Sequence, residues 1–364
     1  DGGDDLLWGD RVDRSDANTA DTVYGGAGSD IYYMVSAGDT LIENPDEGTD
    51  TVYSTISYTL PANIENLTLT GVNVDGNGNN LDNILTGSIG INKLSGGAGD
   101  DSYFINTGKF VTPFGGVVNA PMDIITEATN AGFDTAFSPM TYTLPANMER
   151  LVLTGNDNIN GTGNNLDNVI QGNLAANILS GSTGNDSYYV DTLDTVVESA
   201  NSGIDTVYSS VSYDLRQKTS NVENLILTGN ADGSLTGNEL ANILTGNAGA
   251  NILDGITGAD TLTGGTGRDI FSFSGSDLAT FRTITDFSDI DDSVQLYKNV
   301  FSSLNVSGTV SADNFAIGTA PVDANDYLVY NSGTGDLFYD ADGNGSVASI
   351  RIAVLPVGLG LTNQ

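Results

Sequence analysis

The sequence predicts an all-β protein in which short parallel strands stack into a β-solenoid. Three observations support this prediction: a long block recurs along the chain, a period of nine residues lies inside each block, and Gly and Asn interrupt segments of strand-forming residues. Thr, Val, Ile, Leu and Tyr dominate those segments, and none of them has the 3.6-residue spacing of an amphipathic helix. A chain of this kind builds its core along one axis, repeat by repeat.

The long block occurs three times. Its best-defined part is TDTVYSTISYTLPANIENLTLTG at 49–71, which returns with substitutions at 133–155 and 204–229. Apolar and polar residues alternate within it, as in TVYSTISYTL, and this alternation is typical of strands with one buried face. The block therefore predicts strands at equivalent places in three successive parts of the chain.

The shorter period consists of nonapeptides, such as GNNLDNILT, GSIGINKLS and GGAGDDSYF at 78–104, and four more follow one another at 237–272. Glycines gather in the first four places, where they permit tight turns. The sixth residue is Asp or Asn, and the eighth is large and apolar. The residues at the eighth place are Leu85, Leu94, Tyr103, Ile170, Leu179, Tyr188, Leu244, Leu253, Leu262 and Phe271. We expect two nonapeptides to close one flattened coil around these side chains.

The composition restricts the function. Asp and Glu number 47 against 11 Lys and Arg, and the net charge of −36 argues against nucleic acids and anionic membranes as partners and favours cations. The chain has no Cys and no His, which rules out thiol catalysis, disulfides, the usual zinc sites and histidine-dependent triads. No apolar stretch is long enough to span a bilayer. One large apolar side chain per nonapeptide buries too little surface to offset chain entropy and charge repulsion, so the fold needs a bound cation.

The turns offer backbone carbonyls and one carboxylate or amide each, and these hard oxygen ligands suit Ca²⁺. GGAGSDIYY at 25–33, GGAGDDSYF at 96–104 and GGTGRDIFS at 264–272 resemble the GGxGxDxUx nonapeptides of RTX proteins, the hemolysin-type calcium-binding repeats. The resemblance spans nearly the whole chain and implies a right-handed parallel β-roll with calcium ions between its stacked turns. In that family, the sixth residues of nonapeptides i and i+2 share an ion with carbonyls from the first four places.

Transferred to this sequence, the resemblance pairs Asn83 with Asp101, Asn168 with Asp186, Asn242 with Asp260, and Asn251 with Asp269. The further ligands that it implies are Asp30, Gly96, Ala98, Gly99, Gly264, Gly265, Thr266 and Gly267. Each pair joins one Asn to one Asp, where the best sites of the family have two Asp, so we expect dissociation constants of roughly 10⁻⁴–10⁻³ M. An alternative is that the Asn turns hold no ion and are stabilised by hydrogen bonds of their amide groups along the stack.

Other residues recur with the block. Glu43, Glu127 and Glu198 share one block position, and Glu65, Glu149 and Glu223 share another. A carboxylate that recurs in every block of a solenoid indicates a structural or solvated position rather than a catalytic one. The aromatic pairs at 32–33, 103–104 and 188–189 are interpreted as core and edge packing rather than as a sugar-binding platform.

The nonapeptides stop after Phe273, and we divide the chain into a repeat domain at 1–274 and a C-terminal domain at 275–364. TITDFSDIDDSVQL at 283–296 resembles the segment that caps the β-roll of serralysin-like RTX proteins. This resemblance implies a C-terminal β cap and adds Asp286 and Asp292 as candidate calcium ligands. A solenoid needs such a cap because its last coil exposes an unpaired strand edge.

The segment 326–355 predicts successive hairpins. Its DADGNG loop at 340–345 matches the first half of an EF-hand but has Arg351 in place of the bidentate Glu. Two interpretations remain: a plain hairpin turn, or a weak calcium site formed by Asp340, Asp342 and Asn344. The ending LPVGLGLTNQ resembles the uncleaved export signal of type I secretion substrates.

The leading functional hypothesis is a calcium-binding module that folds when the type I secretion machinery delivers it to the extracellular space or the bacterial cell surface. We expect it to be the C-terminal part of a larger secreted protein whose catalytic domain, where one exists, lies upstream. A second hypothesis is a surface, adhesin or matrix protein that self-associates through Ca²⁺ or binds cell-surface polysaccharide. A β-helical polysaccharide lyase or epimerase is a third, although Lys109, Arg150 and Lys218 lie in no repeated acidic cleft of the sequence.

Overall fold

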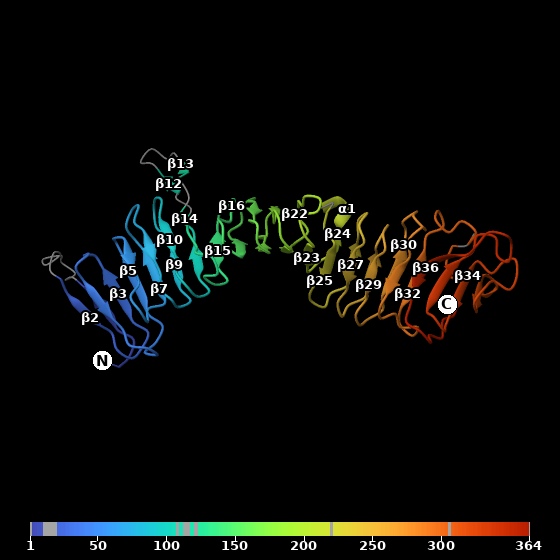
Figure 1. The fold of residues 1–364 in the computed structure, drawn as a ribbon, viewed down its shortest axis with the longest axis horizontal. Helices are drawn as coiled ribbons and strands as arrows, with labels where there is room; N and C mark the ends of the chain where they lie inside the picture. The colour runs from blue at the N-terminus through green and yellow to red at the C-terminus, as the bar shows by residue number, and fades with distance from the viewer. Residues whose placement is uncertain are drawn as a thin grey trace. The chain divides into compact units, whose positions relative to one another are not determined.

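The computed structural model describes residues 2–9, 20–106, 109–111, 117–119, 123–218, 221–304 and 307–363. Strands and turns make up nearly all of these residues, which also include one short helix, α1 (Leu215–Lys218), and one 3₁₀ turn, η1 (Ala312–Asn314). The chain forms two compact units, Asp1–Asp186 and Ser187–Gln364, and in each of them the strands lie side by side like rungs (Figure 1). The predicted fold class, an all-β parallel solenoid, is confirmed.

In the first unit, successive coils contribute strands to one long parallel sheet. In spatial order these are β1 (Leu6–Trp8), β3 (Ile31–Met34), β5 (Thr51–Ser54), β7 (Asn66–Leu69), β9 (Ile84–Thr86), β11 (Ser102–Phe104), β15 (Thr135–Ser138), β17 (Arg150–Leu153) and β19 (Val169–Gln171). The other side of the coils carries shorter parallel strands. They are β2 (Thr22–Tyr24), β4 (Thr40–Ile42), β6 (Tyr58–Thr59), β8 (Gly76–Asn77), β10 (Lys93–Ser95), β14 (Ile124–Ile125), β16 (Tyr142–Thr143), β18 (Gly161–Thr162) and β20 (Ile178–Ser180). β12 (Lys109–Val111) and β13 (Val117–Asn119) form a separate antiparallel pair.

The second unit repeats this plan. One parallel sheet consists of β21 (Ser187–Val190), β23 (Thr206–Ser209), β25 (Asn224–Leu227), β27 (Ile243–Thr245), β29 (Thr261–Thr263) and β31 (Arg282–Ile284). The other consists of β24 (Tyr213–Asp214), β26 (Gly233–Thr236), β28 (Asn251–Asp254), β30 (Ile270–Phe273) and β32 (Ser293–Leu296), and the short strand β22 (Thr195–Val196) precedes them along the chain. The predicted strand-and-turn repeat thus continues through both units.

Two nonapeptides form one coil, as predicted. Leu85 pairs with Tyr103 and Leu244 with Leu262 in the neighbouring coil, and the sixth residues of successive coils are likewise 18 residues apart. All ten side chains at the eighth place are at most 1% exposed. The core of each unit is therefore a single column of large apolar side chains, and the turns at the coil edges lie close to it.

The C-terminal region extends the second unit. β33 (Phe315–Ile317) pairs with β34 (Leu328–Asn331), and β34, β35 (Asp336–Tyr339) and β36 (Ile350–Val354) pair antiparallel in succession, which confirms the predicted hairpins. β36 then pairs parallel to β31 and covers the edge of its sheet. The described residues beyond Val354 form neither helix nor strand. No helix among the described residues has the length and apolar character needed to cross a membrane.

Candidate metal centres in the stacked turns

The sixth residues of the nonapeptides form ladders along the edges of each unit. The backbone N–H of one residue donates to the side-chain oxygen of its counterpart in the next coil. These bonds join Asn83 to Asp101 (2.7 Å), Asn168 to Asp186 (2.7 Å), Asn242 to Asp260 (2.9 Å) and Asn251 to Asp269 (2.8 Å). The structure thus brings together all four pairs that the sequence predicts, and it joins them by hydrogen bonds.

The glycine at the first place of a nonapeptide leaves room for the carboxylate at the sixth. A Cβ atom on Gly96 would overlap Oδ2 of Asp101, and one on Gly264 would overlap Oδ2 of Asp269. The other predicted ligands in these two turns are Ala98, Gly99, Gly265, Thr266 and Gly267. The backbone of the turn therefore surrounds its own carboxylate closely, and a larger residue at the first place would close this space.

The side-chain amides of the sixth-place residues Asn83, Asn168 and Asn242 are fully hydrogen-bonded. Nδ2 of Asn83 donates to two backbone carbonyls of the preceding coil, those of Ile64 and Glu65, over 3.1 Å each. Its Oδ1 accepts the backbone N–H four residues earlier over 2.7 Å. Asn168 and Asn242 make the same set of bonds in their own coils. This geometry supports the alternative in which the Asn side chains stabilise their turns without an ion.

The sixth-place Asp residues differ from the sixth-place Asn residues because a carboxylate has no N–H to donate. Oδ2 of Asp101 and Oδ2 of Asp269 are buried without a hydrogen-bond partner. Burial raises the pKa of Asp101 to about 7 and also raises that of Asp269, while the backbone N–H that each accepts offsets only part of the effect. Unpaired carboxylate oxygens inside a protein are costly unless a cation neutralises them. The residues of these turns therefore fit a bound calcium ion.

The turn of Asp260 has a positive charge from the protein itself. Nε of Arg282 lies 3.7 Å from Oδ2 of Asp260, and the two side chains are 1% and 0% exposed. Burial raises the pKa of Asp260 to about 7, and the backbone N–H of Asn242 and the guanidinium of Arg282 act against this rise. Arg282 lies beyond the last nonapeptide, so the repeat pattern does not predict this ion pair. The calcium role of Asp260 stays a prediction.

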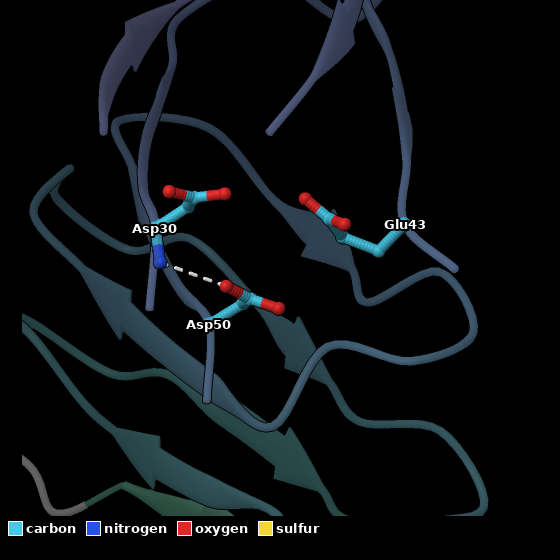
Figure 2. Close-up of side chains that lie close together, drawn as sticks. All are labelled: Asp30, Glu43 and Asp50. Atoms are coloured by element: carbon cyan, nitrogen blue, oxygen red, sulfur yellow. Dashed lines mark hydrogen bonds between the residues drawn. The ribbon is translucent and has the colours of Figure 1, made fainter. Parts of the chain in front are cut away.

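Two clusters of three carboxylates lie where nonapeptide turns meet the long block. One combines Asp30, Glu43 and Asp50, the other combines Asp101, Glu127 and Asp134, and in each cluster one oxygen from every residue lies within 4.8 Å of the other two. Figure 2 shows Glu43 facing Asp30 and Asp50, and the backbone N–H of Asp30 donates to Oδ1 of Asp50 over 2.8 Å. Each cluster thus combines one nonapeptide Asp with the first Asp of the long block and with the glutamate that recurs just before that block.

All six carboxylates of these clusters are buried, with exposed fractions of 0% to 7%. Burial, together with the negative charge of neighbouring carboxylates, raises the pKa of Glu43 and of Glu127 to about 7 and that of Asp134 to about 6. Of the two positions that the sequence left open, structural or solvated, the solvated one is excluded for both glutamates by their burial. Sequence reasoning also missed Asp50 and Asp134, although the recurring Asp of TDTVY and FDTAF was the available signal.

The second recurring set of glutamates has the structural role that the sequence suggests. Oε2 of Glu65 accepts the backbone N–H of Asp50 over 2.8 Å, and Oε2 of Glu149 does the same for Asp134. Glu223 repeats the bond in the third block, over 2.9 Å. These glutamates continue the ladder where the coil has no sixth-place Asp or Asn.

The two acidic residues of the predicted cap bind backbone N–H groups with both oxygens. Asp286 accepts from Gly264 over 2.9 Å and from Gly265 over 2.8 Å. Asp292 accepts from Asp269 over 2.9 Å and from Ser288 over 2.8 Å. Both residues thus complete the last turns of the repeat region, and a calcium role for either stays a prediction.

The DADGNG loop connects β35 to β36. Oδ2 of Asp340 accepts the hydroxyl of Ser349 over 2.7 Å, and Oδ2 of Asp342 accepts a backbone N–H over 3.2 Å. The N–H of Asn344 donates to the backbone oxygen of Asp323 over 3.0 Å. The bonds of Asp340 and Asp342 within the hairpin loop favour the interpretation as a turn. Oδ1 of Asp342 is nevertheless buried without a hydrogen-bond partner.

The nonapeptide repeats match a known protein family. The family model of the RTX calcium-binding nonapeptide repeat matches four stretches, residues 18–34, 77–108, 162–192 and 236–271. This chain carries RTX repeats. Its nonapeptide turns are therefore those of a calcium-binding β-roll, and its cofactor is Ca²⁺ at several sites.

Two curated proteins resemble part of this chain. An endo-1,3-1,4-β-glycanase, ExsH of Rhizobium meliloti (strain 1021), is 47% identical over 88 residues, which are 24% of this chain and 18% of that protein. A second endo-1,3-1,4-β-glycanase, EglC of the same organism, is 41% identical over 85 residues, which are 23% of this chain and 17% of that protein. Each match spans less than a fifth of the relative, so the likeness concerns a limited segment of both proteins.

Proposed function

We propose that this RTX chain is a calcium-driven folding module of a protein secreted by the type I pathway. The observation that carries the proposal is the set of buried carboxylate oxygens without a hydrogen-bond partner in the Asp turns, at Asp101, Asp134 and Asp269. Such atoms disfavour the folded chain when no cation is present. When Ca²⁺ binds them, the free energy of binding becomes free energy of folding. The net charge of −36 acts in the same direction, because it opposes a compact state until cations neutralise it.

Folding that depends on Ca²⁺ suits a secreted protein. Free Ca²⁺ is scarce inside a cell and abundant outside it, so the chain stays expanded in the cytoplasm and folds after export to the extracellular space or the cell surface. A chain without Cys forms no wrong disulfide while it is unfolded.

The two relatives support a proposal about the larger protein to which this module belongs. Both are endo-1,3-1,4-β-glycanases, and the matched segments cover 18% and 17% of their lengths. We infer that this chain is the calcium-binding part of a larger secreted protein that acts on glycans, with catalysis in a separate domain. A general acid and a general base must be in reach of the substrate. The carboxylates of the two acidic clusters are buried and line no open cleft, so they do not suit that role.

A Ca²⁺ titration of the chelated protein tests the proposal. Circular dichroism follows strand content, light scattering follows particle size, and Mg²⁺ at equal ionic strength separates specific binding from charge screening. We expect strand content to rise cooperatively with Ca²⁺ while the protein stays monomeric. Full strand content in EDTA would overturn the proposal. Growth of the particles with Ca²⁺ would instead support the self-assembling surface protein.

A further inference from the structure

We propose that Asp101, Glu127 and Asp134 form a calcium site of a second kind, which a glutamate of the long block completes. Asp30, Glu43 and Asp50 form its counterpart in the first block. The inference rests on the proposed function, because it assumes that the chain binds Ca²⁺. It adds that the strongest sites join one nonapeptide Asp to two carboxylates that lie outside the nonapeptide repeat.

The distances suit one ion. One oxygen from each of Asp101, Glu127 and Asp134 lies within 4.8 Å of the other two. Oxygens that bind one Ca²⁺ lie 2.3–2.6 Å from it, so any two of them are at most about 5 Å apart. The ligands are carboxylate oxygens alone, and this set suits a hard cation and offers nothing to a soft metal.

Backbone groups hold each carboxylate in position. Oδ1 of Asp101 accepts the N–H of Asn83, and Oδ1 of Asp134 accepts the N–H of Asp101 over 2.9 Å. Oε1 of Glu127 accepts the N–H of Gly96 over 3.1 Å. The second oxygen of each residue remains buried without a hydrogen-bond partner. Three side chains are thus fixed by one oxygen each and present the other to a shared space.

No positive charge of the described chain neutralises this cluster. Among the residues that the structure describes, the ion pairs of Lys and Arg involve Asp214, Asp260 and Asp336. Asp101 and Asp134 are 1% and 0% exposed, so water does not screen their charges. Three buried carboxylates in contact repel one another strongly, and a divalent cation removes most of that repulsion.

The first block repeats the arrangement. The N–H of Gly25 donates to Oε1 of Glu43 over 3.2 Å, as the N–H of Gly96 does to Glu127, and Oε2 of Glu43 is buried without a partner. Oδ2 of Asp30 differs in that it accepts the hydroxyl of Tyr32 over 3.4 Å. In both blocks the glutamate comes from the chain between the two Asp rungs, which are 20 and 33 residues apart instead of the 18 of a plain coil.

The charge of the ligands sets the order of binding. A turn that pairs Asn with Asp offers one negative charge, whereas each cluster offers three. Because calcium affinity increases with the number of charged ligands, the two clusters fill first, and the nonapeptide turns that belong to neither cluster fill at higher Ca²⁺ concentration.

The experiment uses the full chain, with Glu43→Gln, Glu127→Gln and the double variant. Glu239→Gln is the matched control, because Glu239 is an exposed glutamate of a nonapeptide turn and lies in neither cluster. Calorimetry with Ca²⁺ counts the tight sites. Tb³⁺ luminescence excited through tyrosine reports on the clusters directly, since the hydroxyls of Tyr32 and Tyr103 lie beside Asp30 and Gly96.

We expect each single variant to lose one tight equivalent of Ca²⁺ and part of the Tb³⁺ signal, the double variant to lose two equivalents, and the control to lose none. In EDTA, Glu127→Gln should melt no lower than the parent, because it removes repulsion, whereas in Ca²⁺ it should melt lower. A purely structural glutamate would lower both melting temperatures equally. Asp134→Asn, which keeps the Oδ1 acceptor, should lose the same equivalent and serves if Glu127→Gln folds poorly.

Two failures are distinguishable. A parent chain that binds no Ca²⁺ would overturn the proposed function, and this inference with it. A parent that folds with Ca²⁺ while the double variant keeps every tight equivalent and the full Tb³⁺ signal would overturn the second kind of site alone.

Discussion

Nε of Arg282 lies 3.7 Å from Oδ2 of Asp260, and both side chains are almost completely buried. The guanidinium also donates to the backbone oxygens of Ile256 and Asp277, and it lies 5.4 Å from the centre of the Phe273 ring. At Asp101 and Asp269 the corresponding carboxylate oxygen has no partner. The turn of Asp260 therefore has a cation that the protein itself supplies, whereas the Oδ2 atoms of Asp101 and Asp269 have no such partner.

Replacing Arg282 should show how far Asp260 depends on this guanidinium. In Arg282→Gln, Asp260 becomes a buried charge without a counter-ion, which we expect to lower the free energy of unfolding in EDTA by about 3–5 kcal/mol. Ca²⁺ should restore part of the loss. Urea unfolding with and without Ca²⁺ measures both effects. Arg216→Gln is the control, since the Arg216 side chain is 48% exposed in its pair with Asp214 and should contribute less than about 1 kcal/mol. Equal losses in the two variants would contradict this prediction.

Sixth-place Asn and Asp residues differ in the hydrogen bonds of their side chains, and this difference predicts the effect of replacing an Asp by an Asn. Asp269→Asn gains N–H donors for neighbouring carbonyls and loses a buried charge without a hydrogen-bond partner at Oδ2. We expect its free energy of unfolding in EDTA to increase by about 1–3 kcal/mol, while the further increase caused by Ca²⁺ becomes smaller. Chemical denaturation in the two buffers checks this. A variant less stable than the parent in EDTA would show that the amide does not replace the cation.

The space beside the sixth-place carboxylate should not tolerate a side chain at the first place. In Gly96→Ala the new Cβ atom meets the carboxylate of Asp101, and we expect a loss of about 1–3 kcal/mol together with weaker Ca²⁺ binding. Gly318→Ala is the control, because the nearest atom to its Cβ would be 3.9 Å away. Thermal unfolding and calorimetry measure the two effects, and a Gly96→Ala chain as stable as the control would refute the steric argument.

Stability without calcium should fall as the pH rises. Burial raises the pKa of Asp101, Glu127 and Glu43 to about 7, so between about pH 4 and pH 7 the folded chain holds protons that the unfolded chain has lost. The free energy of unfolding then decreases with pH across this window. In EDTA we expect a higher melting temperature at pH 5 than at pH 7.5, and in excess Ca²⁺ a smaller difference or the reverse. A melting temperature in EDTA that rises with pH would contradict the assignment.

Much of this architecture follows from the nonapeptide alone. The period of nine predicts the coil of two nonapeptides, the core position of Leu85 and its equivalents, and the pairing of Asn83 with Asp101. These features are predictable because they depend on one turn and on the identical turn above it. The alternation of apolar and polar residues in the long block likewise predicts its strands.

The clusters and the ion pair were not predictable in the same way. Glu127 reaches Asp101 and Asp134 from a segment whose length differs between blocks, so no fixed spacing marks the contact. Arg282 lies beyond the last nonapeptide and meets Asp260 only because β31 pairs with β29. A repeat predicts contacts between equivalent residues, and both of these contacts join residues that are not equivalent.

The ladder of sixth-place residues also has a direction. Asn251 gives its N–H to Asp269, and Asp269 gives its own to Asp292, so every rung is completed by a residue later in the sequence. The two ends of the stack are consequently unlike, and a coil lacks an acceptor until its successor is in place. A deletion that removes one coil thus leaves the N–H group of the preceding coil without its acceptor.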